Sequence, residues 1–169
     1  MKLFLVCLSI LFFVFALARP QSGTAKAKMK SEGIEVVLLL DVSESMKAED
    51  VKPSRLEFMK KEMIRFVEKS VGDRIGIVAF AGSAVLLTPV TQDKGALKMY
   101  IETLSTDSVS TQGTDFGKAL QEAESAFKRG GLEDSEESVV TRAIIIASDG
   151  EDNEEKGLET AGENFKRWN

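Results

Sequence analysis

Residues 34–40 form the stretch that most constrains how this chain can fold. The run IEVVLLL is apolar apart from one glutamate and lacks the spacing of an amphipathic helix. Continuous Val/Ile/Leu runs are typical of strands that are buried on both faces, as in parallel sheets covered by helices. The run therefore predicts a central strand with helices packed on both sides of its sheet.

Oxygen-bearing side chains follow this predicted strand directly. Asp41 comes first, and the serines Ser43 and Ser45 follow at alternate positions. In open parallel sheets, ligands bind in the crevice beyond the carboxyl ends of the strands. The segment therefore predicts a ligand-binding loop that carries one carboxylate and two hydroxyls.

The composition narrows the chemistry that such a loop can support. The chain has 169 residues and a net charge of −5, with 22 Lys and Arg residues against 27 Asp and Glu residues, so it has no basic surplus for nucleic acid. It has no histidine, and its single cysteine is Cys7. This inventory excludes Ser-His-Asp and Cys-His nucleophilic systems and Cys/His zinc sites. A metal site must therefore use oxygen ligands, which favours Mg²⁺, with Mn²⁺ and Ca²⁺ as alternatives.

The N-terminus predicts export. Residues 3–18 carry no charge, are mostly apolar and end in Ala-Leu-Ala, the small-x-small pattern of a signal-peptide cleavage site. The run is shorter than the roughly 20 residues of a usual membrane-spanning helix. We expect a signal peptide or membrane anchor at 1–18, a polar linker at 19–33 and one domain at 34–169. Both alternatives for 1–18 place the domain outside the cytoplasm, in the periplasm or at the cell surface, secreted or membrane-anchored.

The rest of the chain alternates apolar strands with amphipathic helices. Two of the strands are separated by so short a turn that they must form an antiparallel hairpin. The predicted strands are 34–40, 74–80, 84–88 and 139–147, and the predicted helices lie near 53–69, 97–104, 116–127 and 158–168. This alternation predicts an α/β fold with a doubly wound, mainly parallel sheet and helices on both faces.

Two further loops of this sheet carry oxygen ligands. Thr114 follows a glycine and opens a helix, where a hydroxyl is a natural N-cap, and Asp149 follows the last predicted strand. Because loops after adjacent parallel strands open at one edge of a sheet, we expect both residues to join the loop after the first strand. The candidate metal ligands are Asp41, Ser43, Ser45, Thr114 and Asp149. Two carboxylates and three hydroxyls suit Mg²⁺ and leave it electrophilic toward an outside carboxylate.

These motifs together resemble the metal-ion-dependent adhesion site (MIDAS) of von Willebrand factor A (VWA) domains. The shared motifs are D-x-S-x-S at 41–45, Gly-Thr at 113–114 and Ser-Asp-Gly at 148–150. The surrounding sequence is similar to one branch, the bacterial aerotolerance-type (Bat) membrane proteins. The similar segments are ALARPQ at 16–21, LLLDVSESM at 38–46, AEDVKPSRLE at 48–57, GDRIGIVAFAGSA at 72–84 and SDGED at 148–152.

The resemblance implies a function and a role for each ligand. It implies that Ser43, Ser45 and Thr114 contribute hydroxyls, and that Asp41 and Asp149 act directly or through water. A Glu or Asp of a partner protein would complete the metal shell. The implied protein is a non-enzymatic, metal-dependent interaction module outside the cytoplasm, in a membrane complex with related VWA proteins where it is anchored.

The family also implies a strand order, 3-2-1-4-5-6. Members continue beyond the last predicted helix with further strands, so we expect the final strands of the sheet to be lacking here. In that order the strand at 139–147 would be an uncovered apolar edge. Asp149 would then follow an exposed strand.

Two other functions remain as alternatives. One is a metal-dependent phosphoryl-transfer or hydrolytic enzyme with Asp41 as nucleophile. Against it, no lysine is among the candidate site residues, and Ser43 stands where such an enzyme would carry a second acid. The other is a VWA subunit of a metal-chelatase or AAA-ATPase-coupled complex, which the export-type N-terminus disfavours.

Overall fold

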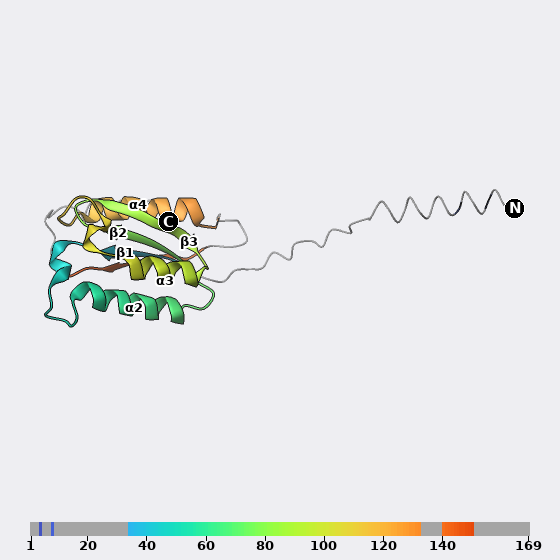
Figure 1. Ribbon diagram of the computed structural model, residues 1–169. Coiled ribbons are helices and arrows are strands. Elements are labelled where there is room, and N and C mark those ends of the chain that lie inside the picture. Colours follow the sequence, from blue (N-terminus) through green and yellow to red (C-terminus); the bar gives the residue numbers. More distant parts are fainter. Residues whose placement is uncertain (1–3, 5–7, 9–33, 133–139, 151–169) are drawn as a thin grey trace. The chain divides into compact units, whose positions relative to one another are not determined.

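The computed structural model describes residues 34–132 and 140–150, together with Phe4 and Leu8. Its strands are β1 (Glu35–Asp41), β2 (Arg74–Phe80), β3 (Ala84–Thr91) and β4 (Arg142–Ala147). They form one sheet in the order β3-β2-β1-β4 (Figure 1). β1 pairs in parallel with β2 and β4, whereas β3 runs antiparallel to β2. The predicted mainly parallel sheet, the 3-2-1-4 part of its strand order and its hairpin are confirmed.

β1 lies between two parallel neighbours, and every one of its residues is buried. Leu38, for example, pairs with Ile77 on β2 and with Ile145 on β4. Because side chains on both faces of such a strand enter a packed core, its sequence shows no alternation of apolar and polar residues. This burial holds Asp41, the last residue of β1, at a fixed point at the carboxyl end of the central strands.

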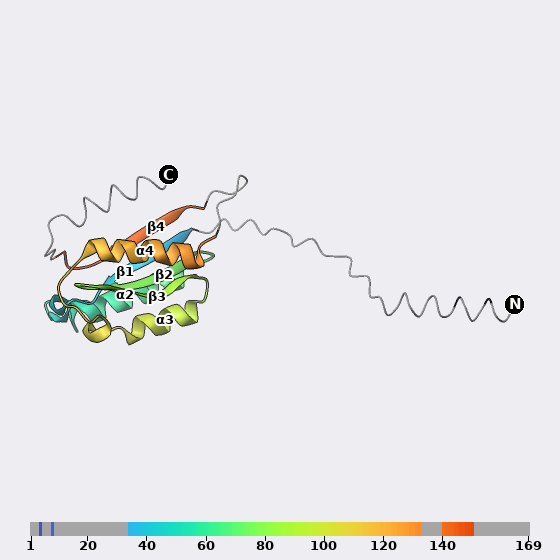
Figure 2. The same ribbon diagram turned by 90° about the horizontal axis from the view of Figure 1, so that it is seen from above.

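Helices cover both faces of the sheet (Figures 1 and 2). α2 (Arg55–Lys69) and α3 (Lys94–Thr103) pack on one face, and α4 (Phe116–Gly130) packs on the other. The two faces of β1 divide between these layers, with Leu38 and Leu40 in the core beside α2 and α3, and Leu39 in the core beside α4. The doubly wound α/β fold expected from the sequence is therefore confirmed.

Several loops gather where the parallel strands end. A short 3₁₀ helix, η1 (Glu44–Lys47), follows β1 and contacts a second one, η2 (Thr106–Ser108). Figures 1 and 2 show η1, the start of α2 and the end of β4 at this same end of the sheet. We call the loops at this end the carboxyl rim, defined as residues 42–48, 81–83, 109–115 and 148–150.

One helix begins two residues later than predicted, and another has a different N-cap. α2 begins at Arg55, after Pro53, and Ser54 is its N-cap, since the Ser54 hydroxyl accepts the Glu57 N–H at 3.2 Å. α4 begins at Phe116, and its N-cap is Asp115, whose carboxylate accepts the Lys118 N–H at 3.0 Å. The prediction that Thr114 caps this helix is therefore wrong. Aspartate is at least as good a cap as threonine, and here it stands one residue closer to the helix.

The two outer strands of the described sheet also differ from their predicted limits. β3 continues through Pro89 to Thr91, which an edge strand tolerates because one side of it needs no ladder N–H. β4 begins at Arg142, and the start predicted at 139 lies outside the described residues. β4 is the other edge of the described strands, as the predicted order requires, and Ile146 on it is 40% exposed.

Several predicted segments lie outside the described residues. These are the linker at 19–33, the helix at 158–168 and, apart from Phe4 and Leu8, the signal or anchor at 1–18. Among the residues whose structure is described, no helix is both long enough and apolar enough to cross a membrane. The proposed division into signal or anchor, linker and domain therefore stays a prediction.

Candidate metal centre

Asp41 links two loops of the carboxyl rim. Its side chain is fully buried, and its Oδ1 accepts the Ser43 N–H at 2.8 Å. Its Oδ2 accepts the hydroxyl of Ser148 at 2.6 Å, and that hydroxyl also accepts the Gly150 N–H at 3.1 Å. The carboxylate thus ties the loop after β1 to the loop after β4.

Ser43 and Ser45 present their hydroxyls to each other. Ser43 occupies the N-cap position of η1, but its side chain makes no capping hydrogen bond. Its Oγ instead lies 3.0 Å from the Oγ of Ser45. Met46, buried in the core beside α2, anchors η1 from below. The alternation of Ser43 and Ser45 therefore brings the two hydroxyls together at the start of η1.

Thr114 lies on the same rim, next to the end of β2. The Gly82 N–H donates to Thr111 O and the Asp115 N–H donates to Ala81 O, both at 2.9 Å. β2 is the immediate neighbour of β1, with Asp41 paired to Phe80. Thr114 is nearly fully buried, at 3% exposure. The backbone of the 111–115 loop is thereby held against the loop after β2, the strand next to β1.

Asp149 follows β4 and forms an ion pair with Arg55. Its Oδ2 accepts Nη1 of Arg55 at 2.9 Å, and its side chain is only 7% exposed. The same guanidinium donates through Nε and Nη2 to Asp50, each at 2.9 Å. These hydrogen bonds, that to Asp50 first and that to Asp149 second, raise the pKa of Arg55, and Arg55 in turn lowers the pKa of Asp50.

The sequence prediction missed two residues that shape this centre. Ser148 precedes Asp149 within the Ser-Asp-Gly triplet, so its place in this motif could have identified it as part of the site. Arg55 had no such signal, because its contact with Asp149 spans 94 positions of sequence. The structure therefore joins Asp41, Ser43, Ser45 and Ser148 by hydrogen bonds, places Thr114 on the same rim and pairs Asp149 with Arg55.

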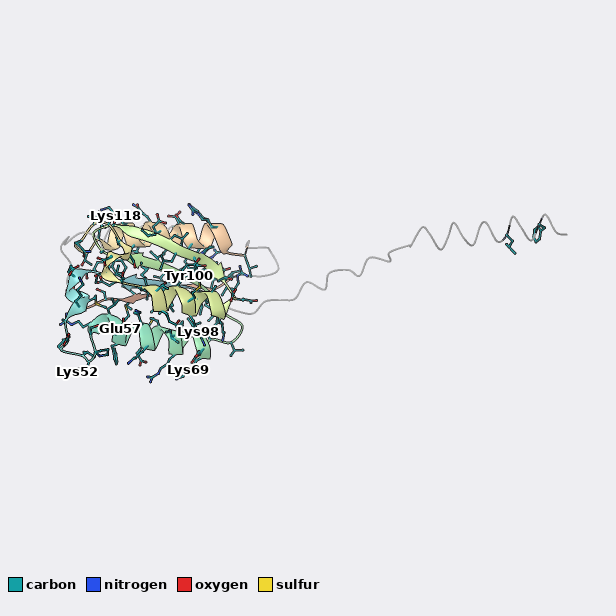
Figure 3. All side chains as sticks on the ribbon, in the orientation of Figure 1. Lys52, Glu57, Lys69, Lys98, Tyr100 and Lys118 are labelled. Atoms are coloured by element: carbon teal, nitrogen blue, oxygen red, sulfur yellow. The ribbon has the colours of Figure 1, made fainter. Side chains whose placement is uncertain are left out.

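A lysine stands beside the Thr114 loop. Lys118 lies at the same end of the molecule as Lys52, whereas Lys69 and Lys98 lie farther along their helices (Figure 3). The Nζ of Lys118 is 2.7 Å from Asp115 Oδ2 and donates to Gly82 O at 2.9 Å. Burial raises the pKa of Asp115, but the hydrogen bonds from the Lys118 side chain and backbone outweigh it and leave this pKa below its usual value. The lysine thus braces the loop.

The donor set fits a hard divalent cation. Adjacent ligands of an octahedral Mg²⁺ with bonds of 2.0–2.1 Å lie about 3 Å apart, which is the spacing of the Ser43 and Ser45 hydroxyls, 3.0 Å. Within the described part of the chain, no three His, Cys, Asp or Glu side chains cluster as a metal site. A cation on this rim would therefore depend on hydroxyl oxygens, which suit Mg²⁺ better than softer metals.

Two solved structures from Bacteroides share the fold and more than a third of the aligned sequence. BatB from Bacteroides thetaiotaomicron, a conserved hypothetical protein, is 38% identical with a TM-score of 0.71, covering 80% of this chain and 62% of that one. An aerotolerance-related membrane protein from Bacteroides fragilis is 35% identical with a TM-score of 0.70, covering 80% and 63%. The similarity to Bat-type proteins inferred from the sequence is confirmed.

A more distant structure shares the fold alone. Proximal thread matrix protein 1 from the mussel byssus, with its MIDAS motif occupied by zinc, is 22% identical with a TM-score of 0.62. The match covers 80% of this chain and 33% of that one. It supports the architecture of the sheet and helices described above.

Curated sequences and a family model agree with these structures. A relative from Borreliella burgdorferi is 31% identical over 144 residues, which is 85% of this chain and 40% of the relative. The chain spans about two fifths or less of the length of the curated relatives it matches. The family model described as von Willebrand factor type A domain matches residues 36–151, a range that includes every candidate ligand. The chain therefore belongs to the von Willebrand factor type A domain family.

Proposed function

We propose that the carboxyl rim binds a divalent cation and, through it, an acidic side chain of a partner protein. The observation that carries the proposal is the chain of hydrogen bonds from Ser45 through Ser43 to Asp41 and Ser148. It holds two hydroxyls at the spacing of adjacent octahedral ligands. A bound divalent cation supplies an electrophilic coordination position for a carboxylate from outside.

Asp41 and the residues of the rim have different roles in holding that cation. Ser43, Ser45 and Thr114 offer neutral hydroxyl oxygens. Asp41 orients this set, because its two carboxylate oxygens accept hydrogen bonds from the loops after β1 and β4. Asp149 completes the proposed set, directly or through water. Neutral ligands leave most of the charge of the cation available to a partner's Glu or Asp.

The proposed role is non-enzymatic. The phosphoryl-transfer alternative needs Asp41 as an accessible nucleophile, but its side chain is fully buried and both of its oxygens accept hydrogen bonds. The chain also has no histidine to serve as a general base. A hydrogen-bonded, buried carboxylate suits the orientation of other ligands better than attack on a substrate.

Mg²⁺ is the cation we favour, with Mn²⁺ and Ca²⁺ as alternatives, because the candidate ligands are all oxygen atoms. The zinc-occupied MIDAS motif of the mussel byssus protein supports divalent-cation binding by this fold. The Bacteroides fragilis structure is that of a membrane protein, which supports an extracytoplasmic, membrane-associated location. The export-type N-terminus agrees and disfavours the chelatase or AAA-ATPase alternative.

Calorimetric titration of the chain with Mg²⁺ and Mn²⁺ tests the metal site. We expect Ser43→Ala and Asp41→Ala each to weaken binding at least about tenfold, since one removes a ligand and the other the group that orients it. Ser125→Ala is the matched control, because Ser125 lies on α4 and its hydroxyl bonds only within its own helix, to Gln121 O. Unchanged affinity for both metal ions in Ser43→Ala and in Asp41→Ala would contradict the proposal.

A second experiment tests the partner. The chain should retain a protein with an accessible acidic segment in the presence of Mg²⁺ and release it on addition of a chelator. Asp41→Ala should fail to retain it under either condition. Retention that is indifferent to both the chelator and Asp41→Ala would show that binding does not pass through this site.

A further inference from the structure

Arg55 joins two carboxylates of very different exposure. Toward solvent, it makes a two-pronged contact with Asp50, whose side chain is 54% exposed. Toward the rim, it donates from Nη1 to Asp149, whose side chain is 7% exposed. The guanidinium itself is 31% exposed. One cation is therefore shared between a surface acid and a candidate metal ligand.

The position of this arginine runs against the usual electrostatics of helices. Arg55 is the first residue of α2, where the helix dipole disfavours positive charge. Its backbone is fixed there, because the Arg55 N–H donates to Ala48 O at 2.9 Å. The two carboxylates offset the unfavourable dipole and hold the guanidinium over the rim. Capping of α2 does not require this pair of carboxylates, since Ser54 already caps the helix.

The positive charge of Arg55 opposes the binding of a metal ion on the rim. Arg55 contributes a positive charge within hydrogen-bond distance of the Asp149 carboxylate, so it offsets one of the two negative charges of the proposed ligand set. A divalent ion that takes Asp149 as a direct ligand must share its carboxylate with Arg55 or displace that hydrogen bond. Fewer negative ligands weaken the hold on the ion but leave it more attractive to an outside carboxylate.

We infer that Arg55 is a positioning residue that holds Asp149 out of direct contact with the metal and thereby limits metal affinity. The inference rests on the proposed function and specifies how that site is tuned. Asp50 competes for the same guanidinium from the solvent side, so it weakens the hold of Arg55 on Asp149. Metal affinity would then rise when Arg55 is lost and fall when Asp50 is lost.

Calorimetric titration of the full chain with Mg²⁺ and Mn²⁺ tests this inference. Arg55→Met should tighten binding roughly 3- to 10-fold, the scale expected for removing one nearby charge at a partly exposed site. Arg55→Lys keeps the charge and should bind metal like the parent chain. Arg65→Met is the matched control, because Arg65 lies on the same helix in a surface pair with Glu62. Water-proton relaxation by bound Mn²⁺ should fall in Arg55→Met, since Asp149 then replaces a coordinated water.

A purely structural role for Arg55 has a different signature. It would lower the thermal midpoint of Arg55→Met and weaken or leave unchanged its metal binding, and that result overturns the inference. If Arg55→Met does not fold, Asp50→Asn decides, because Asp50 is on the surface. Asp50→Asn should weaken Mg²⁺ binding more than Glu49→Gln, which removes a charge from the neighbouring exposed position. Equal effects of these two variants would overturn the inference as well.

The same titrations separate this inference from the proposed function. If the parent chain binds Mg²⁺ and Asp41→Ala abolishes it, the site exists, and the Arg55 variants then test the tuning alone. If the parent chain binds neither Mg²⁺ nor Mn²⁺, the site and its tuning are both wrong.

Discussion

At the scale of single residues, the rim is organised by side chains that fix other side chains. Ser148 bonds Asp41 through its hydroxyl proton and accepts the Gly150 N–H, so one hydroxyl orients a carboxylate and closes the turn after β4. Asp115 likewise caps α4 and pairs with Lys118. Each such residue makes two contacts with different groups, which restricts its rotamer and reduces the freedom of the candidate ligands beside it.

Asp115 provides a pH-dependent test at this scale. Its pKa in the folded chain is lowered, so its contribution to stability is present above the unfolded value of about 3.9 and is lost as the pH falls through the folded value. Asp115→Asn keeps a capping side chain but removes the charge. We expect urea denaturation between about pH 2.5 and 6 to show less loss of stability at low pH in this variant.

Glu102→Gln is a suitable comparison for that measurement, because Glu102 is exposed on α3. Its stability should follow the parent profile closely. If Asp115→Asn also follows the parent profile, the Lys118 pair does not contribute to acid stability.

At the scale of elements, Thr114 is positioned by the close approach of two loops. A Cβ on Gly82 would lie 2.2 Å from the carbonyl oxygen of Gln112, so no side chain fits where the loop after β2 passes the 111–115 loop. Gly113 has φ of +111°, a conformation that favours glycine. The two glycines thus allow a backbone contact that brings the start of α4 onto the rim.

Substitution of Gly82 tests whether this contact matters for the metal. Gly82→Ala should push the 111–115 loop away from β2 and weaken Mg²⁺ binding several-fold through Thr114, with a stability loss of about 1–3 kcal/mol from overpacking. Calorimetric titration and urea denaturation measure the two effects. Gly95→Ala, within α3, is the control and should leave metal affinity unchanged. Parent-like metal binding by a folded Gly82→Ala chain would contradict the placement of Thr114.

At the scale of the whole domain, an ionic network holds the end of the sheet opposite the rim. Glu35, at the start of β1, is fully buried between Arg74 of β2 and Arg142 of β4. Its Oε1 also accepts the Leu132 N–H at 2.7 Å, just after α4. Arg74 donates in turn to the carbonyl of Gly130. Three strands and the end of α4 therefore depend on one carboxylate.

Glu35→Gln should destabilise the domain more than Gly82→Ala or any of the exposed substitutions. Removing one partner of a buried ion network leaves uncompensated charge and costs about 3–5 kcal/mol. Urea denaturation should show this loss, whereas Glu62→Gln, which breaks an exposed pair with Arg65, should cost less than about 1 kcal/mol. The metal affinity of the folded Glu35→Gln protein should stay near that of the parent. A stability loss no larger than that of Glu62→Gln would show that the network contributes little.

The sequence predicted the features that depend on local pattern. The run at 34–40 indicated a strand buried on both faces, and β1 is such a strand. The alternation of Asp41, Ser43 and Ser45 predicted their convergence, because residues so close in sequence share one turn. The short 81–83 turn required an antiparallel hairpin, which β2 and β3 form. In each case, chain geometry over a few residues was sufficient.

Only the tertiary structure decided which distant groups meet. The partner of Asp41 in the loop after β4 is Ser148, 107 positions away, and the partner of Asp149 on α2 is Arg55, 94 positions away. Periodicity places a residue on a face or at an end of an element, but side-chain partners depend on the register and packing of elements brought together by the whole fold. The sequence by itself therefore determined the fold and supplied the candidate oxygen ligands. The pairing of Asp149 with Arg55 was decided by the fold, which brings the start of α2 to the loop after β4.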